Sequence, residues 1–334
     1  MEQMSETKPN IFISPISEAK GLNLEDVAKI ARDLIGNTER IIVGKHDQIV
    51  LAVATLFSEG HLLIEDVPGV AKTMLARAIA HSAGCSFKRI QCTPDLQPAD
   101  VLGGTTMNAE TGQASFQFGP LFSQFVLIDE INRVSPRTQA AMLEAMGEGM
   151  ITSENVTYRL ERPFMVIATQ NPIEHEGVFR LPEAQKDRFL IQLTLGYPSL
   201  RDEKEMCSLL QRSHPIETIK AVTTPDRIVA CQQAVREVTV RDEIRDYILA
   251  VVRATREKAS LLLGASPRAS LGLSRLVQAV IAIRGDGDIS MAEVGKLATR
   301  VLDHRVIVKA IENGNQQSAK EIIEEILREV QPGR

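Results

Sequence analysis

The fold is decided by the stretch His61-Leu-Leu-Ile-Glu-Asp-Val-Pro-Gly-Val-Ala-Lys-Thr-Met-Leu-Ala-Arg-Ala-Ile-Ala80. Its apolar residues 62–64 predict a short buried strand, and the apolar spacing that begins at Met74 predicts a helix. A strand, a polar loop and a helix that opens on Lys-Thr form the arrangement of a phosphate-binding P-loop. The unpaired N–H groups and the positive dipole end of such a helix favour a polyphosphate.

The P-loop pattern assigns nucleotide-binding roles to this stretch. We expect the Lys72 amine to reach the β and γ phosphates of ATP and the Thr73 hydroxyl to hold Mg²⁺. The predicted nucleotide-binding residues are Asp66, Val67, Pro68, Gly69, Val70, Ala71, Lys72, Thr73 and Met74.

Two residues depart from the common pattern G-x-x-x-x-G-K-[ST]. Asp66 replaces the first glycine and brings a Cβ atom and a charge to the loop entrance, and Ala71 replaces the second glycine. We expect Ala71 to begin the helix with right-handed dihedrals, and Gly69 to remain free for φ > 0. On this stretch alone, a plain strand–turn–helix with a surface lysine remains an alternative.

Two later strands end in polar residues that suit the same site. Residues 125–128 predict an apolar strand, and the acidic pair that follows would orient Mg²⁺ through Asp129 and the attacking water through Glu130. Residues 164–171 predict another buried strand, which ends in Asn171. Because strands of an open parallel sheet present functional residues at their carboxyl ends, we expect these side chains and Lys72 to converge on one crevice.

Composition counts against several classes of function. The chain has 334 residues, a net charge of −5, 4% aromatic residues and no block of Lys and Arg, which counts against nucleic-acid and anionic-membrane binding. The four cysteines show no metal-ligand spacing, so we expect reduced thiols. No apolar run has the length of a membrane span, and the N-terminus lacks a signal-peptide core. These features predict a soluble cytoplasmic protein.

The chain divides into three predicted parts. Residues 1–20 read as a flexible N-terminal segment, 21–199 as an α/β nucleotide-binding core and 200–334 as a C-terminal α-helical domain. The predicted fold class is a doubly wound parallel sheet with helices on both faces, followed by the all-α domain. Asn23 and Ser135 are predicted helix caps. Helices are expected at about 24–35, 48–58, 135–147, 182–189, 226–238, 242–263, 271–283, 291–302 and 319–330, and hairpins near 112–118 and 151–160.

Several segments carry a family pattern when they are taken together. They are Asp129-Glu-Ile-Asn-Arg133, Leu143-Glu-Ala-Met146, Ala168-Thr-Gln-Asn-Pro172 and Leu181-Pro-Glu-Ala-Gln-x-Asp-Arg-Phe189. With the loop at 65–70, they strongly resemble the MoxR branch of the AAA+ ATPases over roughly residues 25–330. Asp66 and Ala71 both recur in that branch. The resemblance implies an AAA+ core, a helical lid and assembly into a homo-oligomeric ring, usually a hexamer.

The resemblance also implies roles for individual residues. Asn171 corresponds to sensor 1, Arg188 to an arginine finger presented to the neighbouring subunit and Arg268 to sensor 2 on the lid. Residues 93–118 correspond to an insert in the second helix, and residues 151–160 to the hairpin that precedes sensor 1. The adenine-side wall of the nucleotide site is assigned to Ile42, Val43 and Gly44.

Structural alternatives remain open for these residues. Arg188 could instead satisfy the carbonyl groups at a helix end, and Arg133 and Arg180 are rival fingers. Arg268 could be a surface residue, and Asn171 a turn former. The hairpin at 115–118 could serve edge packing or handle a substrate.

We therefore predict Mg²⁺-dependent ATP hydrolysis at subunit interfaces. The resemblance implies chaperone-like remodelling or maturation of a protein client, together with a partner that bears a von Willebrand factor A domain. One alternative is a nucleotide-switched binding scaffold with slow hydrolysis, which the imperfect P-loop favours. A DNA translocase is a less favoured alternative, because aromatic residues are few and basic runs are absent.

Overall fold

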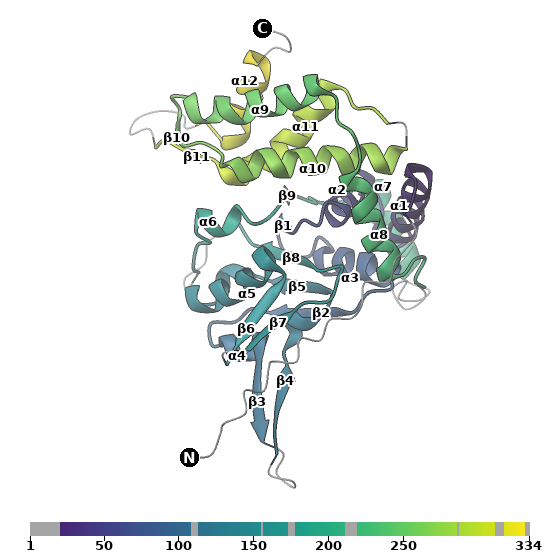
Figure 1. Cartoon of the computed structure of the whole chain (residues 1–334), viewed down its shortest axis with the longest axis vertical. Helices are drawn as coiled ribbons and strands as arrows, with labels where there is room; N and C mark the ends of the chain where they lie inside the picture. The colour runs from purple at the N-terminus through teal and green to yellow at the C-terminus, as the bar shows by residue number, and fades with distance from the viewer. Residues whose placement is uncertain are drawn as a thin grey trace, which may run out of the picture.

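The computed structural model describes residues 21–107, 113–154, 156–172, 178–210, 219–285, 287–310 and 317–330. The predicted N-terminal segment 1–20 lies outside these residues. A sheet with helices on both faces lies beneath a group of helices formed by the C-terminal part of the chain (Figure 1).

The central sheet has five parallel strands. Their order is β2-β5-β8-β1-β9, so β1 lies between β8 and β9. The strands predicted at 62–64, 125–128 and 164–171 are confirmed within a residue or two. The strands are β1 (Leu62–Glu65), β2 (Phe87–Gln91), β5 (Phe125–Asp129), β8 (Met165–Gln170) and β9 (Ile191–Leu193).

Successive residues of the inner strands β1, β5 and β8 enter two different cores. In β1, Leu62 and Ile64 belong to the larger hydrophobic cluster, whereas Leu63 belongs to the smaller cluster on the other face. β5 divides in the same way, with Leu127 on one face and Ile128 on the other. Both faces are therefore covered, which explains why the strands read as continuous apolar runs and confirms the doubly wound fold.

Helices cover the two faces in separate groups. α1 (Leu24–Glu39), α2 (His46–Phe57) and α3 (Lys72–Ser82) contribute to the larger cluster, and α5 (Pro136–Glu148) contributes to the smaller one. Both predicted caps are confirmed: the Asn23 side chain accepts from Asp26 N–H, and the Ser135 hydroxyl accepts from Thr138 N–H. Short helices complete the core at α4 (Pro98–Leu102) and at α6 (Glu183–Lys186), which is shorter than the predicted 182–189.

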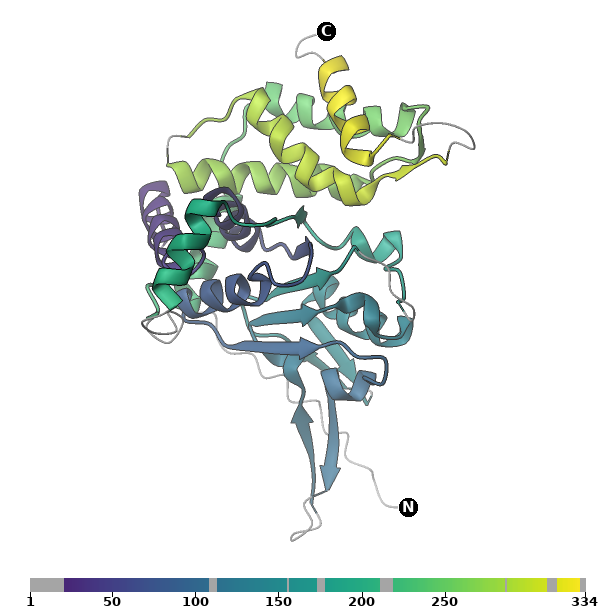
Figure 2. The same cartoon turned by 180° about the vertical axis from the view of Figure 1, so that it is seen from behind.

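Two hairpins extend from the core. β3 (Gly103–Met107) pairs with β4 (Ala114–Phe118), and β6 (Met150–Ser153) pairs with β7 (Val156–Arg159). The β3–β4 hairpin projects at the end of the molecule opposite the C-terminal helices (Figures 1 and 2). The predicted hairpins are confirmed, although Gly112 lies outside the described residues. Phe116 of β4 stacks on Tyr158 of β7 at a centroid distance of 4.8 Å, so these rings do pack the two hairpins together.

The C-terminal part is helical with one two-stranded ribbon. β10 (Leu261–Leu263) pairs antiparallel with β11 (Ile307–Val308), so the helix predicted over 242–263 is wrong beyond Glu257. The chain turns back there because Ala265 N–H donates to the Thr255 hydroxyl and Arg256 Nε donates to Ala265 O. The helices are α7 (Leu200–Leu210), α8 (Pro225–Arg236), α9 (Asp242–Glu257), α10 (Pro267–Arg284), α11 (Met291–Leu302) and α12 (Ala319–Glu329).

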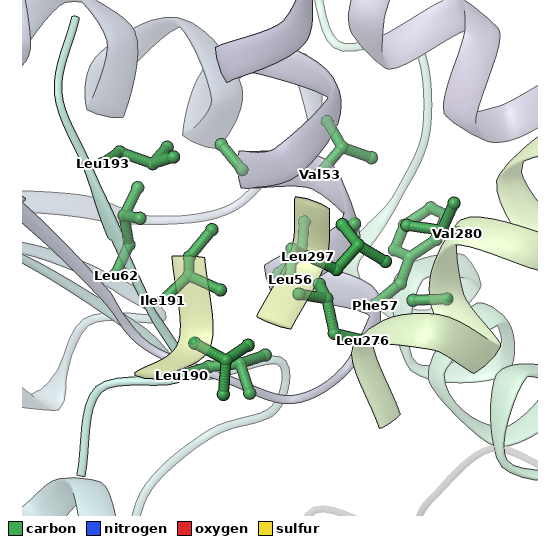
Figure 3. Close-up of a cluster of buried hydrophobic side chains, with 14 of the residues drawn as sticks. Val53, Leu56, Phe57, Leu62, Leu190, Ile191, Leu193, Leu276, Val280 and Leu297 are labelled. Carbon is green, nitrogen blue, oxygen red and sulfur yellow. The ribbon is translucent and has the colours of Figure 1, made fainter. Parts of the chain in front are cut away.

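The C-terminal helices dock on the sheet through a continuous apolar contact. Figure 3 shows side chains of α10 and α11 gathered against α2, β1 and β9. The larger hydrophobic cluster consequently runs through both parts of the chain, while the boundary at residue 199 stays a prediction. The labelled residues are Val53, Leu56, Phe57, Leu62, Leu190, Ile191, Leu193, Leu276, Val280 and Leu297.

Two expectations from composition can be compared with the structure. All four cysteines are free, and only Cys207 is exposed. Within the described part of the chain, no helix combines the length and the apolar character that crossing a membrane requires.

His61 is a buried imidazole that joins the sheet to α5. Its Nδ1 accepts from Val166 N–H at 3.0 Å, and its Nε2–H donates to Met146 O at 3.1 Å. Burial lowers the pKa of His61 from 6.5 to about 4. The unfolded chain therefore binds more protons than the folded chain between these two values, and the free energy of unfolding falls as pH falls through this window.

We expect His61 to account for about 3 kcal/mol of lost stability between pH 7.5 and pH 4, at about 1.4 kcal/mol per unit of pKa shift. The measurement is denaturant unfolding of wild type and His61→Gln at both pH values. The variant should be less stable at pH 7.5, since glutamine keeps only one of the two hydrogen bonds, and its stability should depend less on pH. Equal pH dependence in the two proteins would contradict the assignment.

Candidate functional site

Asp66 organises the loop between β1 and α3. Its carboxylate is buried, with Oδ1 accepting from Val67 N–H at 2.8 Å. Oδ2 accepts from Leu195 N–H at 2.6 Å and from Gly196 N–H at 2.7 Å. The Asp66 carboxylate therefore faces the backbone that follows β9. Its hydrogen bonds hold residues 195 and 196 against the loop.

Because Asp66 satisfies buried N–H groups, restoring the common glycine should harm the protein. We expect Asp66→Gly to lower the free energy of unfolding by about 2–4 kcal/mol, since an unsatisfied buried donor costs about 1–3 kcal/mol. Asp66→Asn, which keeps an acceptor oxygen, should lose less. Denaturant unfolding of both variants measures this, and a glycine variant as stable as wild type would contradict the role given to Asp66.

Ala71 corrects one prediction. It adopts φ 62° and ψ 24°, the left-handed region, and not the right-handed dihedrals expected from the sequence. The loop has to reverse at its last residue because α3 begins at Lys72, and an alanine bears a strain of about 1–2 kcal/mol there. Gly69 has φ +87° as expected, and a Cβ atom at this residue would have no neighbour within 4 Å. The loop is therefore open beside Gly69.

Lys72 and Thr73 open helix α3 directly after the loop. The Lys72 amine donates to the Asp66 carbonyl at 2.7 Å, which folds its side chain back over the loop. Thr73 lies in the first turn, where helix N–H groups have no intrahelical partner. The loop, the helix end and the amine together provide donors for a bound phosphate.

Asp129 is held by two side chains that the sequence did not single out. It is 8% exposed at the end of β5, where its Oδ1 accepts from the Thr169 hydroxyl at 2.6 Å. Its Oδ2 accepts from Arg89 Nε at 3.1 Å and from Arg89 Nη2 at 2.6 Å. Thr169 also accepts from Glu130 N–H at 2.9 Å, so one hydroxyl orients both acidic residues. The only sequence signal for Thr169 was its polar side chain within the apolar strand β8.

Glu130 leaves the strand in a left-handed conformation, with φ 59° and ψ 50°. Its carboxylate forms an ion pair with Arg133 Nε at 2.8 Å. Arg133, an alternative candidate for the finger, thus engages the acidic residue of its own subunit.

Asn171 completes the carboxyl edge of the sheet. It follows Gln170, which is paired in register with Glu65, and Gln170 O accepts from Asp66 N–H at 3.2 Å. Asp129 therefore ends β5, and Lys72, Glu130 and Asn171 follow the carboxyl ends of β1, β5 and β8, as expected.

The segment predicted as the adenine-side wall lies beside the chain that leaves the sheet. Gly44 has φ +71°, and a Cβ atom there would overlap the Asp202 carboxylate. Lys45 Nζ donates to Tyr197 O at 3.0 Å. Gly44 and Lys45 therefore lie against the segment at 197–202, which follows Gly196, whose N–H donates to Asp66.

The two remaining predicted site residues lie elsewhere. Arg188 precedes β9, whose Ile191 pairs with Leu62 at the amino end of β1, and its guanidinium donates to the Leu143 carbonyl of α5. Arg268 lies in the first turn of α10, with its Nη1 4.0 Å from Asp187 Oδ2. The length of β1, about 10 Å at the usual rise per residue, separates this edge of the sheet from the P-loop.

Fold and site together define an ATPase of the AAA+ class. Residues 61–191 match the model of the ATPase family associated with various cellular activities (AAA), and residues 253–326 match the AAA lid domain. Within this class, the chain belongs to the MoxR family.

Relatives support this assignment over nearly the whole chain. Chaperone MoxR1 of Mycobacterium tuberculosis is 35% identical over 95% of this chain and 87% of its own length. Uncharacterized protein YeaC of Bacillus subtilis is 43% identical over 92% of this chain and 96% of its own length. The crystal structure of a presumed ATPase from Cytophaga hutchinsonii superposes with a TM-score of 0.86 at 32% identity, covering 93% of this chain and 97% of the other.

Proposed function

We propose that this chain is an Mg²⁺-dependent ATPase that assembles into a ring, a hexamer by resemblance, and hydrolyses ATP at the interfaces between its subunits. The observation that carries the proposal is the division of the candidate site between two edges of the sheet. The P-loop, the acidic pair and Asn171 lie at the carboxyl edge, whereas Arg188 and Arg268 lie by the amino end of β9. A complete site therefore needs two subunits.

In this proposal each residue at the carboxyl edge has one task. Lys72 neutralises the β and γ phosphates, and the N–H groups of the loop bind their oxygens. Thr73 and Asp129 offer the oxygen ligands that Mg²⁺ prefers and would hold the ion, which would supply positive charge beside the phosphates. Glu130 accepts the proton of the attacking water, which Asn171 helps to orient.

The two arginines complete the site of the neighbouring subunit. Arg188 supplies the positive charge that stabilises the transferred phosphoryl group, and Arg268 supports it from the lid. Their shared location supports a common role in trans, because Asp187 adjoins Arg188 in the chain and lies 4.0 Å from the Arg268 guanidinium.

The work done by hydrolysis would be remodelling of a protein client. One support is the relative named Chaperone MoxR1, which matches 95% of this chain. Another is the β3–β4 hairpin, where Met107 is 69% exposed and Phe118 is 55% exposed, so apolar side chains are available for a client. A partner with a von Willebrand factor A domain follows from the family resemblance alone.

The test is the ATPase rate per subunit as a function of protein concentration, with Mg²⁺ and with excess EDTA. We expect the rate per subunit to rise with concentration as rings form, and to be lost in EDTA. A measurable rate that is independent of concentration would contradict a site shared between subunits.

A nucleotide-switched scaffold remains a second candidate because of two contacts. Glu130 pairs with Arg133, and Arg188 donates to Leu143 O, so both groups are engaged within their own subunit. A non-hydrolysable ATP analogue would then support client remodelling as well as ATP does, whereas the ATPase proposal expects remodelling to stop.

A further inference from the structure

Arg305 is a buried cation in the turn between α11 and β11. Its side chain is 3% exposed, and all five of its N–H groups have acceptors. Nε donates to Asp187 Oδ1 at 2.9 Å. The other four bonds go to main-chain carbonyls, from Nη1 to Leu190 and Val301 and from Nη2 to Asp187 and Phe189.

Three of these carbonyls belong to one short segment, residues 187–190, which carries Arg188. A second side chain of the same turn holds it as well, because His304 Nε2 donates to Phe189 O at 3.0 Å. Gly272 of α10 permits this approach, since a Cβ atom there would lie 2.9 Å from Leu190 Cδ1. Side chains of the lid thus form hydrogen bonds with the backbone on both sides of Arg188.

The Asp187 carboxylate joins this segment to the start of α10. It accepts from the Ser266 hydroxyl at 3.1 Å to Oδ1 and 3.0 Å to Oδ2, and Ser266 is the N-cap of the helix that carries Arg268. One carboxylate therefore contacts the buried Arg305, the cap of α10 and the Arg268 guanidinium, and it adjoins Arg188 in the chain.

We propose that Arg305 and Asp187 are positioning residues that fix the two arginines presented to the neighbouring subunit. This inference rests on the proposed function, since it assigns the pair a role in the shared site. Packing alone does not require this arrangement, because a buried ion pair can often be replaced by apolar residues without loss of stability. A planar guanidinium with five satisfied donors does fix the direction of the backbone it binds. The lid and the segment 187–190, which carries Arg188, then form one rigid body.

The test uses Arg305→Lys, which keeps the charge but cannot satisfy five acceptors. We expect its ATPase turnover to fall about 10- to 100-fold, as for a small displacement of a reacting group. The KM for ATP should not change, because the edge of the sheet that carries Lys72 is intact in this variant. Rings that contain subunits of two different variants show whether the Lys72 edge or the Arg188 edge has lost its function. Adding Glu130→Gln subunits, which carry intact arginines, should restore turnover at the Arg305→Lys sites. Adding Arg188→Ala subunits should not.

Matched variants keep the result decisive. Arg300→Lys, an exposed arginine on α11, should behave as wild type and should restore Arg188→Ala sites when mixed with them. Ser266→Ala removes the hydroxyl bonds to Asp187 together with the cap bond from Arg268 N–H. It should show the pattern of Arg305→Lys with a smaller loss. Thermal melting identifies the variants that fold.

Two negative outcomes have different meanings. If Glu130→Gln and Arg188→Ala restore each other but neither folded variant follows the Arg188→Ala pattern, the positioning role is overturned and the shared site stands. If Glu130→Gln and Arg188→Ala do not restore each other, the shared site itself is overturned.

Discussion

Replacing Arg188 with alanine is expected to lower the ATPase rate of the assembled protein by about 10³- to 10⁵-fold, the effect of losing an arginine finger. The reason lies in the sheet, where Arg188 precedes β9 at the edge opposite the P-loop. The positive charge of Arg188 therefore cannot act at the nucleotide site that Lys72 of its own chain forms. Its loss should affect the nucleotide site of a neighbouring subunit. The rate per subunit should stay low at every protein concentration, whereas the wild-type rate rises.

A matched control separates a finger from a helix-end cation. The Arg188 guanidinium donates to Leu143 O, so its removal also frees a carbonyl group near the end of α5. Arg188→Lys keeps a donor and a charge there but loses the planar fork that suits phosphate oxygens, and it should be nearly as inactive. Arg180→Ala tests the rival finger. An Arg188→Ala protein with wild-type turnover, or a larger loss in Arg180→Ala, would reject the assignment.

The sequence predicted those parts of the fold that short-range patterns determine. Apolar runs located β1, β5 and β8, and polar residues directly after them located the carboxyl edge of the site. The caps Asn23 and Ser135 were readable because a capping side chain binds an N–H group only three residues away.

What the sequence could not show depends on contacts between distant residues. The role of Asp66 arises from Leu195 and Gly196, and that of Thr169 from Asp129. Neither contact has a local pattern. Ala71 was misjudged because the dihedrals of a loop's last residue depend on where the next helix begins, not on the residue's own preference.

The place of the candidate finger, Arg188, also depends on a contact between distant residues. Its motif suggested a role for Arg188, but only the parallel pairing of β9 with β1 shows which edge of the sheet it occupies. Likewise, the buried Arg305 lies 118 residues from Asp187 in the chain, and nothing in its local sequence indicates the ion pair.

Glu130→Gln is expected to keep ATP binding and to lower turnover by about 10²- to 10⁴-fold, the usual contribution of a general base. The amide has nearly the shape of the carboxylate but cannot accept the proton of the attacking water. Folding should not suffer, because the backbone N–H of residue 130 still donates to the Thr169 hydroxyl. The lost ion pair with Arg133 is partly exposed, and such pairs contribute about 0–1 kcal/mol.

Binding and turnover have to be measured separately to test this role. Equilibrium binding of a fluorescent ATP analogue should give similar affinities for wild type and Glu130→Gln, while phosphate release separates the two proteins. Glu148→Gln, an exposed residue at the end of α5, provides a matched loss of charge and should keep full turnover. If Glu130→Gln retained substantial hydrolysis, the proton acceptor would have to be another group. If it lost nucleotide binding, Glu130 would serve the P-loop and not the attacking water.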